Sequence, residues 1–191
     1  MSSTGGGVLA TSALGSPGVC VHSWDESNGI FSMLAQLNHH SDEGATAAVL
    51  NCNNQVVASA SASGKVLLTL PDPARAPLFE FEPMPGREVA SLSFDATSRY
   101  LSCVGEHENV FIWDLKKKKQ VRELKGHAQG CFLNSVAFSP DGQQIASGGN
   151  RGEVLCHNVR GRDVACRLVR DVSDSTDSLV GQVRFSPLRP S

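Results

Sequence analysis

Long hydrophobic runs are missing from this sequence of 191 residues. No stretch approaches the roughly 18 consecutive apolar residues of a membrane-spanning helix. The N-terminal segment MSSTGGGVLATSALGSPG also lacks the basic start and the long apolar core of a secretion signal. We therefore expect a chain that is neither secreted nor associated with a membrane.

Cysteine pairs and catalytic motifs are missing as well. The six cysteines show no C-x-x-C spacing, which argues against a zinc knuckle or a disulfide scaffold and predicts free, buried thiols in a reducing compartment. The sequence has no glycine-rich phosphate loop, no nucleophile elbow and no paired carboxylates. These absences predict a protein that is not an enzyme and that uses no cofactor, metal or small-molecule substrate.

Charge of one sign is not in excess, because the formal net charge is only -2. Without a broad basic field, the chain is not expected to bind nucleic acid. What is present is a globular composition, with 40% hydrophobic residues against 19% charged residues. This balance predicts a fold built around apolar packing.

The segment 110–127, VFIWDLKKKKQVRELKGH, has the pattern of two strands joined by a turn. Apolar, β-branched and aromatic residues from Val110 to Trp113 predict a strand covered on both faces. Alternating polar and apolar residues from Gln120 to Leu124 predict an outer, half-exposed strand. The solvated turn between them carries four consecutive lysines, Lys116, Lys117, Lys118 and Lys119.

A Trp-Asp pair at the end of a strand, followed by Gly-His, is the signature of a WD40 repeat, which has a period of about 40 to 45 residues. The parts of this signature occur at Trp24, Asp25, Trp113, Asp114, Gly126 and His127. The next question is whether the sequence repeats at that period.

A repeat is visible when Leu50, Phe94 and Phe138 are placed in register, since both steps are 44 residues long. Small and aliphatic residues then coincide along the strands that follow. A further copy begins at 182–187, QVRFSP, which resembles SVAFSP at 135–140. The pattern predicts four short strands in each repeat and an all-β fold, a partial WD40 β-propeller.

The repeats divide the chain. Residues 1–18 are predicted to be a flexible N-terminus with a short strand at Val8 to Thr11, and residues 19–191 to be WD40 repeats. The predicted repeats are a partial blade at 19–43, blades at 44–86, 87–130 and 131–175, and the stub of a further blade at 176–191.

The length of the chain is short for a closed ring. Closed propellers have about 4 to 8 blades, and a seven-bladed ring needs about 300 residues at this period. We therefore expect about four blades in an open or incomplete ring, and a chain that is a fragment or a partial array. Unpaired strand edges and apolar faces at the ends predict marginal stability or aggregation.

In WD40 blades a hydrogen-bond relay runs from the Gly-His histidine through a serine or threonine and a turn aspartate to the tryptophan N–H. By resemblance His127 and Ser147 take the first two roles. Arg151 stands where the aspartate is expected, and His157 where the tryptophan is expected. The relay of this repeat is therefore predicted to be broken.

The preceding repeat departs from the pattern in another way. It keeps Trp113, but Arg87 follows Gly86 in place of the histidine, and Ser102 or Cys103 must serve as the small polar residue. No repeat is complete, so the sequence predicts a divergent WD40 array.

Three clusters suggest chemistry but have simpler interpretations. Cys156 and His157 are consecutive in a strand, so their side chains point to opposite faces and cannot share a proton. Residues 106–108, Glu-His-Glu, fall in a predicted hairpin turn. The metal-capable side chains of His39, His40, Asp42 and Glu43 lie in one polar connector, for which a solvated loop is the favoured interpretation.

The four lysines are a candidate interaction surface, either as a nuclear-import signal or as a phosphate-binding tip. Without interleaved aromatic residues they do not predict contact with nucleic acid. Ser16, Ser139 and Ser186 each precede a proline and are candidate phosphorylation sites. Ser139 and Ser186 share one repeat position, which turn chemistry explains first.

Three segments in order, YLSCVGEHENVFIWDLKKKKQVRELKGH, IASGGNRGEVLCHNV and DSLVGQVRFSPL, carry a more specific resemblance. They resemble the N-terminal propeller of the neural-precursor-expressed, developmentally down-regulated adaptors, which target the γ-tubulin ring complex to centrosomes and spindles. The resemblance covers about Val19 to Leu188. It implies a cytoplasmic scaffold at the centrosome, microtubule-organising centre or spindle that takes part in microtubule nucleation in mitosis.

The implied partners are components of the γ-tubulin ring complex, or other centrosomal and spindle proteins. In the family a helical tail grips the γ-tubulin complex, and no segment of this sequence corresponds to it, so no residue is assigned to that contact. The alternative is a general WD40 subunit of another complex, such as a ubiquitin-ligase substrate receptor or a chromatin assembly, and a nuclear location then remains open.

Overall fold

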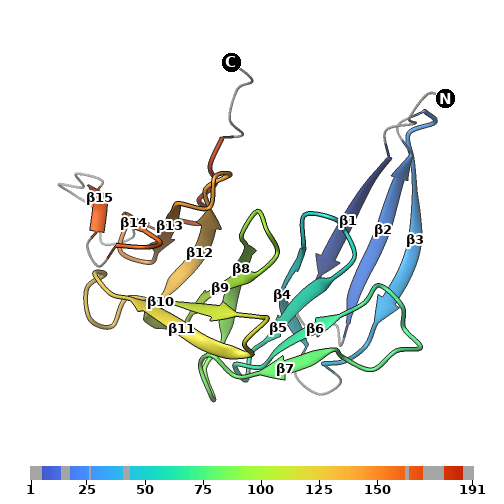
Figure 1. The fold of residues 1–191 in the computed structure, drawn as a ribbon, viewed down its shortest axis with the longest axis horizontal. Coiled ribbons are helices and arrows are strands. Elements are labelled where there is room, and N and C mark those ends of the chain that lie inside the picture. Colours follow the sequence, from blue (N-terminus) through green and yellow to red (C-terminus); the bar gives the residue numbers. More distant parts are fainter. Residues whose placement is uncertain are drawn as a thin grey trace.

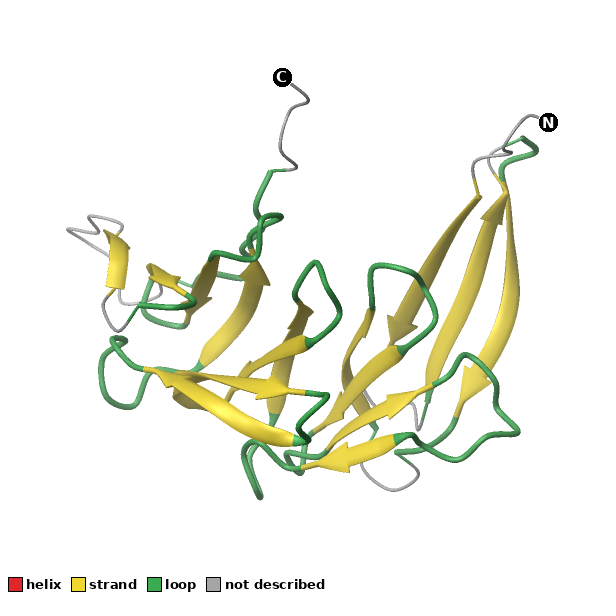
Figure 2. Cartoon of the chain, viewed as in Figure 1, coloured by secondary structure: helices red, strands yellow, loops and turns green. Residues whose placement is uncertain are grey.

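The computed structural model describes residues 6–13, 18–25, 27–40, 44–161, 164–169 and 179–186. Every regular element among them is a β-strand, fifteen in all, and every pairing is antiparallel (Figures 1 and 2). In these residues no helix has the length and apolar character needed to cross a membrane.

The strands form four sheets in sequence order. Sheet 1 contains β1 (Gly6–Ser12), β2 (Val19–Asp25) and β3 (Ile30–Leu37). Sheet 2 contains β4 (Ala45–Leu50), β5 (Val57–Ser61), β6 (Val66–Thr69) and β7 (Phe79–Phe81). Sheet 3 contains β8 (Val89–Phe94), β9 (Tyr100–Gly105), β10 (His107–Asp114) and β11 (Lys119–Leu124). Sheet 4 contains β12 (Leu133–Phe138), β13 (Gln144–Gly149), β14 (Glu153–Asn158) and β15 (Val164–Val169).

The 44-residue repeat is visible in the backbone. The turn between the first two strands of sheets 2, 3 and 4 has a left-handed residue at the same repeat position: Asn54 with φ 59°, Ser98 with φ 57° and Gly142 with φ 67°. Asparagine and glycine tolerate this conformation better than other residues. The register found in the sequence is therefore a register of hairpins.

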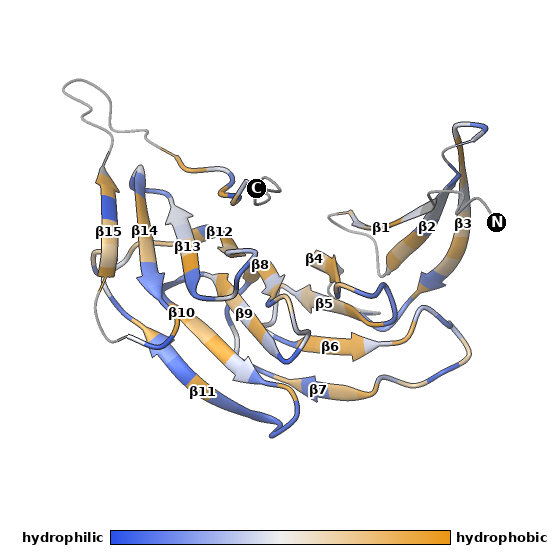
Figure 3. Ribbon diagram, turned by 45° about the horizontal axis from the view of Figure 1, so that its top comes forward, coloured by the Kyte–Doolittle hydropathy of each residue, from blue (hydrophilic) through white to orange (hydrophobic). Residues whose placement is uncertain are grey.

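The sheets pack face to face in chain order and form an open arc (Figure 1). Between sheets 1 and 2 the core includes Val21, Leu37 and Val57, and between sheets 3 and 4 it includes Ile112 and Ile145. Figure 3 shows sheets 1 and 4 at the two arms of the arc. The all-β, partial propeller predicted from the sequence is confirmed.

Sheet 1 starts earlier than the sequence suggested. β1 extends beyond the strand expected at Val8 to Thr11, and it pairs with β2 along its whole length, from Gly6 opposite Asp25 to Ser12 opposite Val19. Residues 6–12 thus belong to the first sheet, because their alternating side chains pack Val8 and Ala10 against its core.

Candidate interaction surface and the buried hydrogen bonds behind it

A buried hydrogen-bond chain links the strands of sheet 4. His127 lies before β12, and its Nε2 is 2.8 Å from the Ser147 hydroxyl on β13. Its Nδ1 is 3.1 Å from Glu153 on β14, and Glu153 also pairs with Arg167 on β15 at 2.9 Å. Since a carboxylate only accepts, Nδ1 donates to Glu153, and Nε2 accepts from the Ser147 hydroxyl. These interactions connect three strands, β13, β14 and β15, to the segment that enters the sheet at His127.

The relay was predicted to break at Arg151, but Glu153 supplies the missing carboxylate to His127. The carboxylate comes from the start of β14, two residues after Arg151, and only 8% of Glu153 is exposed. Burial lowers the pKa of His127, and the neighbouring carboxylate partly opposes that shift. The signal that could have found Glu153 is a lone acidic residue at the start of an apolar strand.

His157 takes the place of a tryptophan but not its hydrogen bond. Its Nε2 lies 3.1 Å from the Lys125 carbonyl and donates to it, whereas its Nδ1 is buried without a partner. Burial lowers the pKa of His157. Its neighbour Cys156 stands opposite Cys166 on β15, so the adjacent thiol and imidazole have separate surroundings.

Sheet 2 holds a second buried histidine that the sequence placed in a solvated connector. His40 is only 5% exposed, and its Nε2 is 2.9 Å from the Ser59 hydroxyl on β5. This interpretation of His40 was wrong, because the ring fills the place that His127 fills in sheet 4. Asp42 and Glu43 lie outside the described residues, and within those residues no group of three or more metal-capable side chains gathers.

Sheet 3 lacks this arrangement in its described residues, all of 89–124. Cys103 occupies the repeat position of Ser59 and Ser147, and burial raises the pKa of its thiol well above the usual range. Of the two residues that the sequence offered for the relay, Cys103 thus stands at the relay position, whereas the Ser102 side chain points to the other face and donates to the Ser93 carbonyl at 3.1 Å.

Trp113 is accordingly held by packing. Its indole Nε1 is buried without a hydrogen-bond partner, and its ring lies 4.2 Å from the Phe81 ring of sheet 2, centroid to centroid. Arg87, which stands in the place of the histidine, is exposed and donates to the Glu106 carbonyl at 3.4 Å. Glu106 itself lies at the bend between β9 and β10.

Asp114 fixes the lysine turn. It is 1% exposed, lies 2.9 Å from the Arg99 guanidinium and accepts from the Lys117 backbone N–H at 3.0 Å. The hydrogen bond from Arg99 holds the pKa of this carboxyl below its ordinary value. Lys118 has φ 52° and reaches across the Phe79 ring at 5.3 Å.

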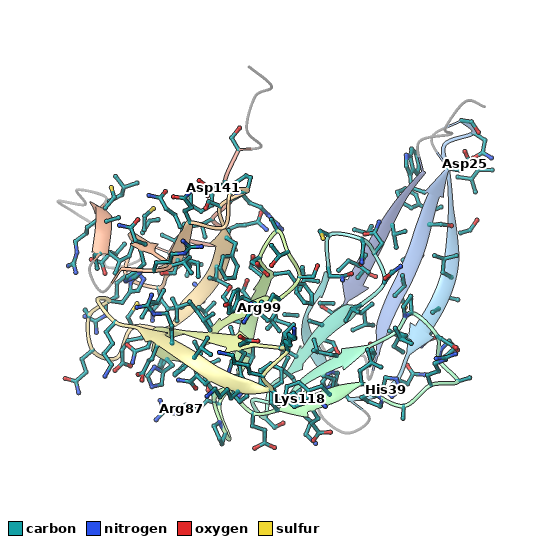
Figure 4. The ribbon with its side chains drawn as sticks, in the orientation of Figure 1. Asp25, His39, Arg87, Arg99, Lys118 and Asp141 are labelled. Carbon is teal, nitrogen blue, oxygen red and sulfur yellow. The ribbon has the colours of Figure 1, made fainter. Side chains whose placement is uncertain are left out.

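All four lysines from Lys116 to Lys119 are exposed, although Lys119 already belongs to β11. Their turn borders a groove of about 680 Å³ between sheets 3 and 4, which we call the rim groove. Figure 4 labels two residues of its lining, Arg99 and Asp141. Its charged lining comprises Asp95, Arg99, Asp114, Lys117, Arg122, Asp141 and Arg160.

The charges of the rim groove differ in their accessibility. Asp95 and Asp114 are buried, and Asp95 accepts from the Tyr100 N–H at 2.7 Å. Lys117, Arg160 and one carboxylate, Asp141, are exposed. Cations therefore dominate the charge that a partner can reach.

The remaining candidates have local roles. Asp25 accepts from the Ser27 hydroxyl and N–H, which lower its pKa, and Trp24 packs on Phe31 with ring centroids 4.5 Å apart. The Ser139 hydroxyl accepts from the Gln144 N–H at 2.9 Å inside its turn. Ser16 lies outside the described residues.

All six cysteines are free, but not all are buried as the sequence suggested. Cys103 and Cys131 are buried, whereas Cys52 and Cys166 are exposed.

Repeated antiparallel sheets, Trp-Asp strand ends and buried His–Ser pairs define the class: the chain is a WD40-repeat protein. The WD domain, G-beta repeat family matches residues 118–158. A chain in the crystal structure of the Mitotic Checkpoint Complex has the same fold, with a TM-score of 0.67 and 20% identity over 85% of this chain and 47% of that one.

Among curated proteins the chain is similar to Protein NEDD1. It is 31% identical to the human protein over 71% of this chain and 20% of that protein, and 33% identical to the mouse protein over 75% and 21%. The chain thus spans about a fifth of the length of these relatives.

Proposed function

We propose that this chain is a WD40 scaffold that positions protein partners for microtubule nucleation at the centrosome and spindle, as the resemblance to the γ-tubulin-targeting adaptors implies. Support comes from the similarity to NEDD1 and from the rim groove. The activity assigned is recruitment, with the γ-tubulin ring complex or its centrosomal anchors as the partners brought together.

The rim groove is the proposed contact site, and the accessible charge on its lining carries this proposal. Its buried carboxylates are neutralised or hydrogen-bonded within the sheet, while Lys117 and Arg160 extend into solvent. A partner with an acidic segment would find complementary charge there, and charge complementarity speeds association and selects partners. Asp114 and Arg99 hold the backbone of the turn in place.

The test is recruitment of the tagged chain to mitotic spindle poles marked by γ-tubulin. We expect enrichment of the wild-type chain and loss of enrichment in Lys117→Glu/Arg160→Glu. The matched control is Arg75→Glu/Lys125→Glu, which reverses two exposed cations outside the groove. This control should remain at the poles.

The outcomes separate the two parts of the proposal. Absence of the wild-type chain from the poles overturns the centrosomal role. Enrichment that survives the groove reversal overturns the groove as the contact site. Equal loss in both variants assigns recruitment to net charge rather than to this site.

A further inference from the structure

Sheet 1 has three strands in the described residues, one fewer than the other sheets. In sheet 3 the Trp-Asp strand β10 stands between outer strand β11 and β9, and β8 lies inside β9. In sheet 1 the Trp-Asp strand β2 stands between β3 and β1. β1 therefore corresponds to β9, and in the described part of the chain sheet 1 has no counterpart of β8. The inner edge of β1, which has no partner strand among the described residues, is a template for another strand.

The opposite end of the arc carries a strand position without a sheet. The Val183 N–H donates to the Ser135 hydroxyl of β12 at 3.0 Å, as the Val136 N–H of β12 donates to Ser91 of β8 at 3.3 Å. Residues 179–186 thus lie against β12 as β12 lies against β8. They hold the innermost position of a next sheet, and the described residues include no other strand of it.

The repeat register agrees with this placement. Phe185 lines a cavity of about 260 Å³ together with its register counterparts Leu50, Phe94 and Phe138. In sheet 3 Phe94 stands opposite Leu101, which stands opposite Trp113. In sheet 1 Trp24 stands opposite Gly7.

Gly7, which pairs with Trp24, holds the position in sheet 1 that Leu101 holds in sheet 3. Phe185, the counterpart of Phe94, is therefore expected opposite Gly7. The antiparallel direction then sets Val183 opposite Leu9.

Within the described residues, both end faces of the arc expose apolar side chains. On sheet 1 Leu9, Phe31 and Met33 are 47%, 58% and 62% exposed. On sheet 4 the exposed Leu168 and Cys166 share a face, since they pair with Val154 and Cys156. Figures 1 and 3 show these two sheets on separate arms of the arc, so in the described residues neither face packs against the other.

We propose that two copies of this chain associate head to tail into a closed ring. Residues 179–186 of each copy add to β1 of the other as its missing inner strand, and the face of sheet 4 packs against that of sheet 1. The described residues of each copy supply fifteen strands and this segment, which together make four sheets of four strands. Two copies make eight sheets, within the range of about 4 to 8 for closed propellers, with the two-fold symmetry common in homodimers.

The register gives the first test. A Leu9→Cys chain and a differently tagged Val183→Cys chain are mixed under oxidising conditions, with Cys52 and Cys166 replaced by serine. We expect a disulfide between the two chains, because directly opposite residues meet the distance requirement. The matched control is Val8→Cys, whose side chain faces sheet 2, and it should not cross-link.

The second test is the mass in solution. Successive N–H groups of a strand point to opposite edges, and the Val183 N–H points to β12. The Arg184 N–H therefore points to β1 in the proposed pairing, and Arg184→Pro removes it. We expect the wild-type chain and Arg184→Ala to sediment as dimers, and Arg184→Pro to dimerise about tenfold more weakly.

Three results overturn the proposal directly: a monomeric wild-type chain, an open series of larger species, or equal cross-linking of the Val8→Cys chain. A chain that carries both Leu9→Cys and Val183→Cys gives a fourth, which is a disulfide formed only within one chain. The last would mean that a single copy closes on itself. None of these results bears on recruitment through the rim groove, so the two proposals fail separately.

Discussion

Sheets 3 and 4 follow the same repeat pattern but are held together differently. Sheet 4 has a buried chain of polar groups from Ser147 through His127 to Glu153. Sheet 3 has Cys103 at the hydroxyl position and an indole N–H without a partner, and it relies on apolar packing and on the Arg99–Asp114 pair at its rim. A blade therefore tolerates loss of the relay when aromatic packing replaces it. Where the relay is present, its members depend on one another.

The largest expected effect follows from removing His127, the central residue of the buried hydrogen-bond series in sheet 4. His127→Ala leaves the Ser147 hydroxyl and the Glu153 carboxylate buried with one partner fewer each, which costs about 3 kcal/mol. Amide hydrogen exchange of β13 and β14 measures this loss. Arg87→Ala, at the same repeat position of sheet 3, is exposed and should change stability by less than about 0.5 kcal/mol. Equal effects of the two substitutions would contradict the comparison.

A smaller effect should follow from pH, and it should separate the sheets. Burial lowers the pKa of His127 and His157 below 6.5, so unfolding takes up protons as the pH falls below that value. Sheet 4 should therefore lose stability as the pH drops from about 6.5. In sheet 3 the pKa of Asp114 is lowered in the folded state, so the stability that this carboxylate contributes is lost only as the pH falls below about 3.8.

Hydrogen exchange of both sheets at pH 7 and pH 5, corrected for intrinsic rates, tests this difference. His127→Ala should flatten part of the response of sheet 4. The same pH response in both sheets would show that the buried histidines do not control it.

The smallest effect should come from rebuilding the relay in sheet 3. Arg87→His and Cys103→Ser place a histidine and a hydroxyl where sheet 4 has His127 and Ser147, beside the unpaired donor of Trp113. The double variant should exceed the sum of the single variants by about 1 kcal/mol in urea unfolding. Arg87→His with Ser102→Ala is the control, and it should be additive because Ser102 faces the other way. Additivity in both pairs would mean that packing has closed the site.

The sequence predicted the features that repeat. The strand pattern, the 44-residue register and the hairpins near Asn54 and Gly142 follow from local residue preferences. The same preferences recur in each repeat, which makes them easy to detect. What it missed is carried by single residues in three dimensions. Glu153 acts from the start of β14 in place of Arg151, and His40 is buried where its ring meets the Ser59 hydroxyl of β5. Neither fact has a periodic signature.

The first strand shows the same limit. MSSTGGGVLATS has the small residues of a flexible end, yet its alternation lets β1 pair with β2 over seven positions. Pairing depends on the partner strand, and local composition does not report the partner. The rim groove could not be predicted from the sequence either, because its lining comes from turns of two sheets.

The serial packing of the sheets has a consequence for how the chain opens. Among the described residues, the main contacts of each sheet are with its neighbours along the arc, as in a linear array of repeats. Sheets 2 and 3 have a neighbour on each side, whereas sheets 1 and 4 have one within a single copy. Unfolding then behaves like fraying, in which the terminal units open at lower free energy than the middle. The most protected amides should lie in β5, β6, β9 and β10, and anything that joins the two ends would raise the cooperativity of the whole chain.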